Sequence, residues 1–500
     1  MDTRMLRYYT QELSYMREMG AEFAAAFPKI AARLSLDPTE VADPYVERLL
    51  EGFSFLAARV RLKLDSEFPR FTQHLLEVVY PHYLTPTPSM AIVQLQPSLT
   101  EGSLAAGFVV PHGTILRGQI PRGEVTACQF RTAHDVTLWP VEISEARYTP
   151  FAADLPLNTL GLTEPVQGVL RFKVRTPAPF TFQQIALDRL NIFLAAGDEV
   201  ALKLYELILG SGLGVLVNPP ARPLPWFEWL GREAIQPVGF ARDQALIPYT
   251  TRSFSGYRLL HEYFAFPERF RFVELTGLRK ALSRHAGDEI ELAIPLARGD
   301  ATLGTMVDKS GFALHCTPAI NLFSRRADRI HVTDQQAEHH VVVDRTKPMD
   351  FEVYGVERVV GYSEGLEAEQ EFRPFYSSFD SDARLPAHGY FSLRREPRAL
   401  SEKQRRDGPR SSYMGTEVSL SLVDPREAPY SGTLRQLGVD VVVSNRDLPL
   451  LMPVGSDRDF SLAISAPVDG IRCLRGPSRP RPAVLDGEIP WRLTSHLSLN

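Results

Sequence analysis

Three prolines, at positions 81, 86 and 88, separate two different hydrophobic patterns in this chain. Upstream of them, apolar residues recur every three or four positions, which is the spacing of one face of an α-helix. Downstream, short runs of alternating apolar and polar residues lie between turn-forming prolines and glycines, the pattern of half-buried strands. This change predicts an α+β, multidomain chain, with an N-terminal helical region followed by several mainly antiparallel β-rich domains with short helices.

The stretch from 42 to 80 predicts two capped helices. Asp43 can accept free backbone N–H groups at a helix start, and Pro44 fits the first helical turn. The first helix carries an apolar stripe on one face, composed of Val46, Leu49, Phe53, Leu56 and Val60. Because proline disrupts a helix interior, a second helix is expected from Pro69 to Pro81, burying Phe71, Leu75 and Val78. Apolar faces this large need a partner surface.

The first 27 residues show a heptad pattern. Its a and d positions are Leu6, Tyr9, Leu13, Met16, Gly20, Phe23 and Phe27. A period of 3.5 residues favours packing of one helix on another, either within the chain or on another protein, although an ordinary amphipathic helix on its own core remains an alternative. The candidate interaction residues are therefore Leu6, Tyr9, Leu13, Met16, Phe23 and Phe27.

Several later segments have readable patterns. Residues 168–176 predict a strand with Arg171, Lys173 and Arg175 on one face, either solvated or facing a partner. Helices are expected over 199–209 and 257–264, and the second leads into a strand with Arg269 and Arg271 pointing outward. Residues 397–410 are rich in Lys and Arg, including Arg405, and predict an exposed loop; docking on an acidic partner is the alternative.

Size and composition limit the class of protein. Five hundred residues exceed one ordinary core, and we expect a helical region over 1–85, a β-rich domain over 86–225, an α+β domain over 226–345 and a β-rich domain over 346–500. The apolar share of 44% and charged share of 23% fit a folded soluble protein. No apolar run is long enough to cross a bilayer, and three widely spaced cysteines suit a reducing compartment, so a cytoplasmic location is predicted. A net charge of −5 argues against a nucleic-acid binder.

Motifs for catalysis or cofactor binding are missing from the sequence. The glycines at 210, 212 and 214 follow a predicted helix and break the dinucleotide spacing at Val215. His261 and Glu262 lack the second histidine that a zinc-protease helix needs, and His331, His339 and His340 lack metal-ligand spacing. The expectation is therefore no catalytic residue, no cofactor and no metal.

Several blocks carry a resemblance to a known family. They are YY and EL at 8–9 and 12–13, FPKIA at 27–31, the 42–90 stretch, GYRLLHEYF at 256–264 with FPE at 266–268, CTPAINLF at 316–323, SNRDLP at 444–449 and WRLTSHLSLN at 491–500. In this order they resemble the type VI secretion baseplate family TssF, also called ImpG or VasA. Family sequences continue beyond the last block, so the chain is expected to be shortened at its C-terminus.

The resemblance implies a structural role. Members of the family are similar to wedge proteins of contractile phage baseplates, on which a sheath and tube assemble. The implied partners are the companion subunit TssG, a second copy of the chain, the TssK adaptor, the sheath-initiating subunit TssE and the VgrG spike. No nucleic acid and no membrane insertion are implied.

Two alternatives remain open at the level of sequence. One is a hydrolase with an unrecognised site, which would need a deep pocket with convergent titratable groups near His261, His331 or His339. The other is a polymer-binding β module that uses Trp226 and Trp229 as an exposed platform. For the structural role, replacing Leu13 and Phe23 with Asp is predicted to abolish association with the companion subunit.

Overall fold

The structure, a computed structural model, describes residues 3–33, 43–99, 101–249, 253–333, 335–363, 369–375, 389–399, 406, 408, 410–424, 430, 432–485 and 488–497. The chain forms two compact units. Unit 1 comprises Met1–Leu84 and Val484–Asn500, and unit 2 comprises Thr85–Ala483. Helices followed by antiparallel sheets confirm the predicted α+β class.

Unit 1 is helical. Its elements are α1 (Thr3–Ala26), α2 (Pro28–Arg33), α3 (Pro44–Val79), the 3₁₀ turn η1 (Pro81–Leu84) and α9 (Glu488–Leu497). Asp43 caps α3, because its Oδ1 accepts the Tyr45 N–H at 2.8 Å, and Pro44 occupies the first turn as predicted. The helix ends at Val79, just before Pro81.

The predicted break at Pro69 is wrong, since α3 runs without interruption from Pro44 to Val79. A proline inside a helix costs about 3 kcal/mol through its missing N–H and its ring. Starting a second helix would require a new and unfavourable nucleation step. If the helix instead continues through Pro69, the hydrogen-bonded turns on both sides of this residue are kept. Phe71, expected to be buried, is exposed.

Unit 2 begins with a six-stranded sheet and a small two-stranded one. The six-stranded order is β24 (Phe460–Leu462), β3 (Ile115–Gly118), β4 (Gln129–Thr132), β15 (Cys316–Ile320), β1 (Met90–Pro97) and β25 (Val468–Arg475). The two-stranded sheet pairs β2 (Phe108–Val110) with β5 (Val136–Leu138). The first sheet joins strands from both ends of unit 2, so its register depends on contacts more than 300 residues apart, such as Leu95 with Ile471.

Two further sheets enclose a common core. The five-stranded order is β10 (Glu228–Gly231), β9 (Gly214–Asn218), β13 (Glu289–Leu296), β7 (Gly168–Arg175) and β6 (Glu142–Thr149). The four-stranded order is β11 (Ile235–Pro237), β12 (Phe272–Leu275), β8 (Leu190–Leu194) and β14 (Phe312–Leu314). Apolar residues of both sheets pack with one side of α4 (Asp198–Ser211), at Leu204 and Ile208, which confirms the helix predicted there.

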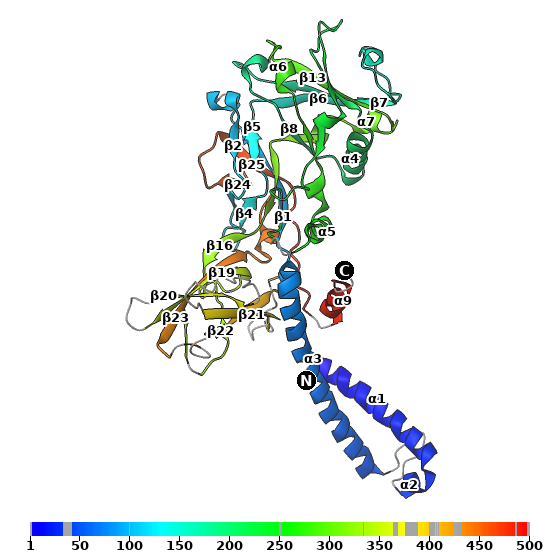
Figure 1. The fold of residues 1–500 in the computed structure, drawn as a ribbon, viewed down its shortest axis with the longest axis vertical. Coiled ribbons are helices and arrows are strands. Elements are labelled where there is room, and N and C mark those ends of the chain that lie inside the picture. Colours follow the sequence, from blue (N-terminus) through cyan, green and yellow to red (C-terminus); the bar gives the residue numbers. More distant parts are fainter. Residues whose placement is uncertain are drawn as a thin grey trace, which may run out of the picture. The chain divides into compact units, whose positions relative to one another are not determined.

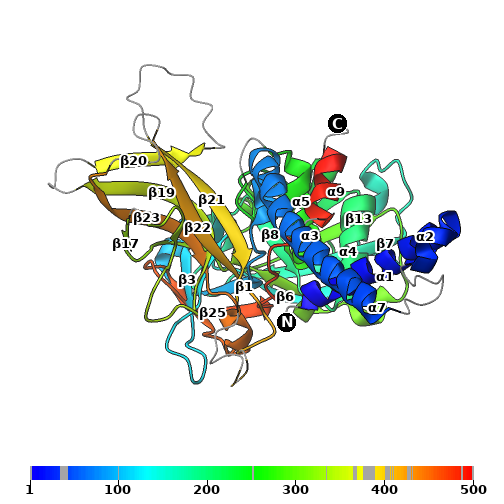
Figure 2. The same cartoon turned by 90° about the horizontal axis from the view of Figure 1, so that it is seen from below.

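The fifth sheet, drawn in yellow and orange in Figure 2, contains eight of the described strands. They are β16 (Phe323–Arg326), β17 (Ile330–His331), β18 (His339–His340), β19 (Glu352–Ser363), β20 (Glu369–Pro374), β21 (Gly389–Pro397), β22 (Thr416–Val423) and β23 (Leu434–Ser444). β20 and β21 run parallel, and the other pairs are antiparallel. Alternate residues of the long strand β23, including Val439, Val441 and Val443, are buried in the core of this sheet.

Short helical segments connect these sheets. They are α5 (Ser255–Ala265), α6 (Arg279–Leu282), α7 (Leu303–Met306), η2 (Gly102–Ala106), η3 (Leu157–Thr159), η4 (Phe182–Gln184), η5 (Arg232–Ala234), η6 (Pro267–Phe270), η7 (Lys309–Gly311) and η9 (Leu448–Leu451). The sheets combine strands from both sides of the boundaries expected at 225 and 345. The division into four domains therefore stays a prediction.

Two expectations about arginines are wrong. Arg171 on β7 is buried, and its guanidinium binds the carboxylates of Asp154 and Glu291. Arg269 and Arg271, expected to point outward, are also buried. Strand alternation failed there because residues 267–270 form a 3₁₀ turn, so that β12 starts only at Phe272. A charged residue can be buried when other groups of the fold pair with it.

Candidate functional site

α1 and α3 form an antiparallel helical hairpin within unit 1 (Figure 1). Arg61 on α3 binds Glu12 on α1 at 2.8 Å, and Arg17 lies 3.5 Å from Glu47. As the residue number increases along α1, the number of its partner in α3 decreases, which sets the antiparallel direction. Both ion pairs are partly exposed, so each contributes well under about 1 kcal/mol and mainly fixes the alignment of the helices.

Small residues line the side of α3 that faces α1. Ser54 and Ala58 are fully buried, one helical turn apart and on the same side as Glu47 and Arg61. The larger apolar residues lie elsewhere. At about 100° per residue, Leu49, Phe53, Leu56, Val60 and Leu64 occupy the opposite side of the helix. We call these five residues the α3 stripe.

The α3 stripe is exposed to solvent. Leu49 is 73% exposed and Phe53 is 58% exposed, and the other three stripe residues are similarly open. Isolated exposed leucines are common, but a continuous stripe over several helical turns is typical of a surface that another protein covers. Covering each side chain stabilises a complex by about 1.5–3 kcal/mol before the costs of association.

The predicted heptad of α1 divides into two groups. Tyr9, Leu13 and Met16 are half-buried, and the ring of Tyr9 packs edge-on against Phe55 of α3 at 6.3 Å. Leu6, Phe23 and Phe27 are exposed, and the rings of Phe23 and Phe27 lie 5.3 Å apart. The middle of the heptad thus packs within the hairpin, and its two ends remain accessible to another chain.

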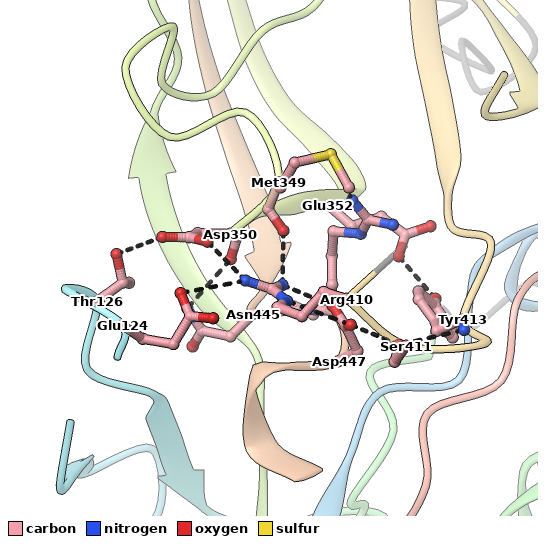
Figure 3. A network of polar contacts seen from close by, with 12 residues as sticks. Glu124, Thr126, Met349, Asp350, Glu352, Arg410, Ser411, Tyr413, Asn445 and Asp447 are labelled. Carbon is pink, nitrogen blue, oxygen red and sulfur yellow. Dashed lines mark hydrogen bonds and ion pairs between the residues drawn. The ribbon is translucent and has the colours of Figure 1, made fainter. Parts of the chain in front are cut away.

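A polar network in unit 2 is centred on Arg410 (Figure 3). Its guanidinium donates to Asp350 Oδ1 at 2.9 Å, to Asp447 Oδ1 at 2.6 Å and to the Met349 carbonyl at 2.9 Å. Glu124, from the segment between β3 and β4, lies 3.6 Å away. Burial alone would raise the pKa of Asp447, but hydrogen bonds from Arg410 and Ser411 hold this pKa below its ordinary value.

This network ties the eight-stranded sheet to the six-stranded one. Asp350 precedes β19 and Asp447 follows β23, whereas Thr126 Oγ1 reaches Asp350 Oδ2 at 2.6 Å from the β3–β4 segment. Arg410 is therefore neutralised within the chain, which favours a structural role for this end of the basic stretch. Arg405 and Lys403 lie outside the described residues.

The histidines singled out for catalysis do not form a common site. His331 and His340 are exposed on β17 and β18, and His339 is buried near Tyr430. His261 Nε2 lies 2.9 Å from Thr87 Oγ1, and burial lowers its pKa. An open cavity of about 650 Å³ is lined instead by residues 117–120, 127, 458–462, 464–466 and 468–471, including Asp459. The Asp459 carboxylate already accepts hydrogen bonds from Gly455, Ser456 and Cys473.

Within the part of the chain that the structure describes, neither metal ligands nor the two tryptophans give a second candidate site. Among the described residues, no group of three or more His, Cys, Asp and Glu side chains could hold a metal ion. Trp226 and Trp229 are half-buried against the apolar clusters of unit 2, and Trp226 lies edge-on to His285. Their packing is that of structural side chains.

Comparison with known proteins identifies the family. The family model described as "Type VI secretion system, TssF" matches residues 1–500. The chain belongs to the TssF family. It is 51% identical over 502 residues to the type VI secretion system component TssF1 of Pseudomonas aeruginosa PAO1, covering 100% of this chain and 80% of that protein.

Two solved structures resemble this TssF chain. One is a chain of the TssK-TssF-TssG baseplate subcomplex, with a TM-score of 0.66 and 27% identity, covering 91% of this chain and 78% of that one. The other belongs to the baseplate complex of the type VI secretion system, with a TM-score of 0.50 and 25% identity over 99% of this chain and 80% of that one. Within the described residues, no helix combines the length and apolar character needed to cross a bilayer.

One block that resembled TssF sequences contains a buried charge cluster that sequence reasoning missed. Glu262 on α5 is fully buried. Its Oε1 accepts the N–H groups of Leu246 and Ile247 at 2.9 Å each, and its carboxylate pairs with Arg258 and Arg269. The Arg258–Glu262 spacing of four residues was visible in the sequence, but the same spacing occurs in exposed helical pairs.

Proposed function

We propose that this TssF chain is a structural subunit of a type VI secretion baseplate, and that its N-terminal helical hairpin is a wedge-building surface. The observation that carries this proposal is the exposed α3 stripe, in a chain that is similar over most of its length to a member of a TssK-TssF-TssG baseplate subcomplex. The chain then acts mechanically, since its interfaces hold neighbouring subunits in one arrangement until the sheath contracts.

The proposed partners follow from this role. TssG and TssK are the subunits named with the similar solved chain, and they are the first candidates for this one. A second copy of the chain, TssE and the VgrG spike are further proposed neighbours. The proposed location is the cytoplasm, near the inner membrane. The exposed ends of the α1 heptad, at Leu6, Phe23 and Phe27, extend the surface available to a partner helix.

A non-enzymatic role is part of the same proposal. The described cavity near Asp459 offers a carboxylate whose oxygens already accept several hydrogen bonds, and the candidate histidines lie on separate elements. A general acid or base must instead reach a reacting group in an accessible site. The arrangement of these residues favours a role in protein–protein interfaces over a catalytic one.

The experiment compares complexes formed by co-expression with TssG and TssK, measured by size-exclusion chromatography with mass determination. Leu49→Asp with Leu56→Asp places two charges on the α3 stripe without touching the α1 side. Loss of two apolar contacts worth about 1.5–3 kcal/mol each should weaken association at least ~100-fold. Leu202→Asp, at an exposed leucine of α4, is the matched control and should leave the complex intact. A wild-type complex that tolerates the double substitution would refute the proposed surface.

A further inference from the structure

Helix α5 buries its charged side and exposes its apolar side, which is the reverse of the usual arrangement for a helix on a protein surface. Its inward side carries Arg258 and Glu262, both buried, whereas Leu260 is 58% and Phe264 is 69% exposed. A helix that packs on its own core normally turns its apolar side inward. The charged residues are held there by specific partners, so the orientation is fixed rather than accidental.

The inward side is tied to the protein by several bonds. Arg258 donates to the carbonyls of Phe240 and Ala241, at 3.2 and 3.3 Å. Arg269 donates to the carbonyls of Gly239 and Gln244. Rotating α5 to bury its aromatic side would leave these charges without partners, at a cost of several kcal/mol each. The aromatic side of α5 must therefore face outward.

The outward side forms a continuous aromatic face. We define the α5 face as the exposed or half-exposed residues Phe254, Tyr257, Leu260, Tyr263 and Phe264. Its rings pack on one another: Phe254 lies 5.5 Å from Tyr257, and Tyr263 lies 5.4 Å from Phe264. Large aromatic residues gathered in this way mark a protein interface more often than a free surface.

The geometry of the face fits a helix. Tyr257, Leu260 and Phe264 are spaced by three and four positions, so they form a ridge along one side of α5. A second helix can place its own apolar ridge beside this one, and both then lose their contact with water. A flat or extended partner would leave the grooves between these residues unfilled.

The charge beneath the α5 face determines which kind of partner helix is favoured. The cluster beneath the α5 face holds two arginines, Arg258 and Arg269, against one carboxylate, Glu262. Burial and the charge of Arg258 lower the pKa of Arg269 to about 9, so Arg269 stays protonated at neutral pH. His134, which also lies near Arg269, has a pKa lowered to about 3 and is neutral. An excess positive charge therefore lies under the aromatic rings.

We propose that the α5 face docks an amphipathic helix of another protein whose apolar stripe is flanked by carboxylates. The excess positive charge of the Arg258–Arg269–Glu262 cluster attracts such a helix. A second copy of this chain is a poorer occupant, because its α3 stripe is flanked by the basic residues Arg59 and Lys63. This inference goes beyond the proposed function, since it concerns unit 2 rather than the N-terminal hairpin.

The test uses the purified full chain and two designed helical peptides, labelled with fluorescein. Both peptides carry leucines at helical spacing; one is flanked by glutamates and its twin by lysines. Fluorescence anisotropy should show the glutamate peptide binding at least ~10-fold more tightly than the lysine peptide. Leu260→Glu with Phe264→Glu should remove this binding, whereas Leu202→Glu on α4 should not. Because all three positions are exposed, the variants should keep the wild-type circular dichroism spectrum and melting temperature.

Several results would overturn the proposal. These are equal affinity for the two peptides, absence of binding, or binding that survives the α5 substitutions. If the Glu variants do not fold, Leu260→Ala removes the contact without adding a charge and should still weaken binding. Sedimentation velocity tests the other occupant: a dimer dissociated by the α5 substitutions would assign the face to a second copy instead. The co-expression experiment on the α3 stripe is separate, so either idea can fail without the other.

Discussion

Asn321 and Asn445, which are 124 residues apart in the sequence, hydrogen-bond to each other twice. Asn321 Nδ2 donates to Asn445 Oδ1 at 2.9 Å, and the Asn445 main-chain N–H donates to Asn321 Oδ1 at 2.7 Å. Both residues are fully buried, and both also bind the main chain of Gln129. The pair thus joins the end of β15, the end of β23 and the start of β4.

Replacing either asparagine with alanine should destabilise unit 2. Asn445→Ala leaves the Gln129 N–H and the buried Asn321 amide without their partner, at a cost of about 1–3 kcal/mol. Urea unfolding followed by tryptophan fluorescence measures the loss. Asn158→Ala, at an exposed residue of η3, is the control and should change stability by less than about 0.5 kcal/mol. Equal effects at the two positions would contradict the assigned role.

Glu262 and Glu199 each lie four residues from a basic partner on the same helix, but replacing them with alanine should affect stability very differently. Glu262→Ala leaves Arg258 and Arg269 buried without their carboxylate, so we expect a loss of about 3–5 kcal/mol or insoluble protein. Glu199 on α4 pairs with Lys203 at 3.1 Å on an exposed surface, and Glu199→Ala should leave the stability nearly unchanged. Soluble yield and thermal unfolding measure both. A stable, soluble Glu262→Ala variant would show that the cluster is not needed for folding.

Leu13 and Phe23, both predicted as interaction residues, should separate into different phenotypes. Leu13 is half-buried, so Leu13→Asp should destabilise the hairpin by about 2 kcal/mol. Phe23 is exposed, and Phe23→Asp should keep the helical content while weakening association with TssG. Far-UV circular dichroism during heating reports the first effect, and co-purification reports the second. The distinction fails if Phe23→Asp melts the hairpin as readily as Leu13→Asp does.

Stability should fall as the pH drops below about 6.5. Burial lowers the pKa of His134 to about 3, with a contribution from Arg269, and burial lowers the pKa of His315 to about 4, each from 6.5. His315 Nε2 accepts the Trp139 N–H, which requires the neutral ring. The unfolded chain binds these protons more readily, so stability is complete above 6.5 and is lost as pH falls toward 4.

Each histidine should contribute a loss of up to about 1.4 kcal/mol per pH unit within that window. Urea unfolding between pH 6 and pH 5 measures the slope, with the interval from pH 7 to pH 8 as the internal control. His134→Leu removes one of the two groups and should reduce the slope by up to about 1.4 kcal/mol per unit. A slope that His134→Leu leaves unchanged would mean that other groups dominate acid unfolding.

The sequence was most informative where a local pattern decides a local structure. Asp43, Pro44 and Pro81 bound α3 as predicted, because capping and proline chemistry act within one turn. The strand over 168–175 and the helices α4 and α5 follow from their hydrophobic periods for the same reason. The break expected at Pro69 failed because one unfavourable residue does not outweigh the continuity of a long helix.

Only the tertiary structure shows whether a given helix face is buried or exposed. Periodicity shows that Leu49 and Phe53 share a face with Leu56, but it does not show whether that face is buried, and here small residues such as Ala58 occupy the inner side instead. Likewise, the pattern around Glu262 and Arg269 is compatible with solvent exposure. Only the fold brings backbone N–H groups to the Glu262 carboxylate and backbone carbonyls to the Arg269 guanidinium.

The sequence by itself determined the secondary structure in outline, the α+β class and the likeness to TssF, since these depend on residue type and spacing along the chain. Only the tertiary structure revealed that α5 buries its charges and exposes its aromatic side chains. It also placed Asn321 against Asn445. Burial and pairing depend on residues that are far apart in the sequence and adjacent in space, and no local pattern encodes that adjacency.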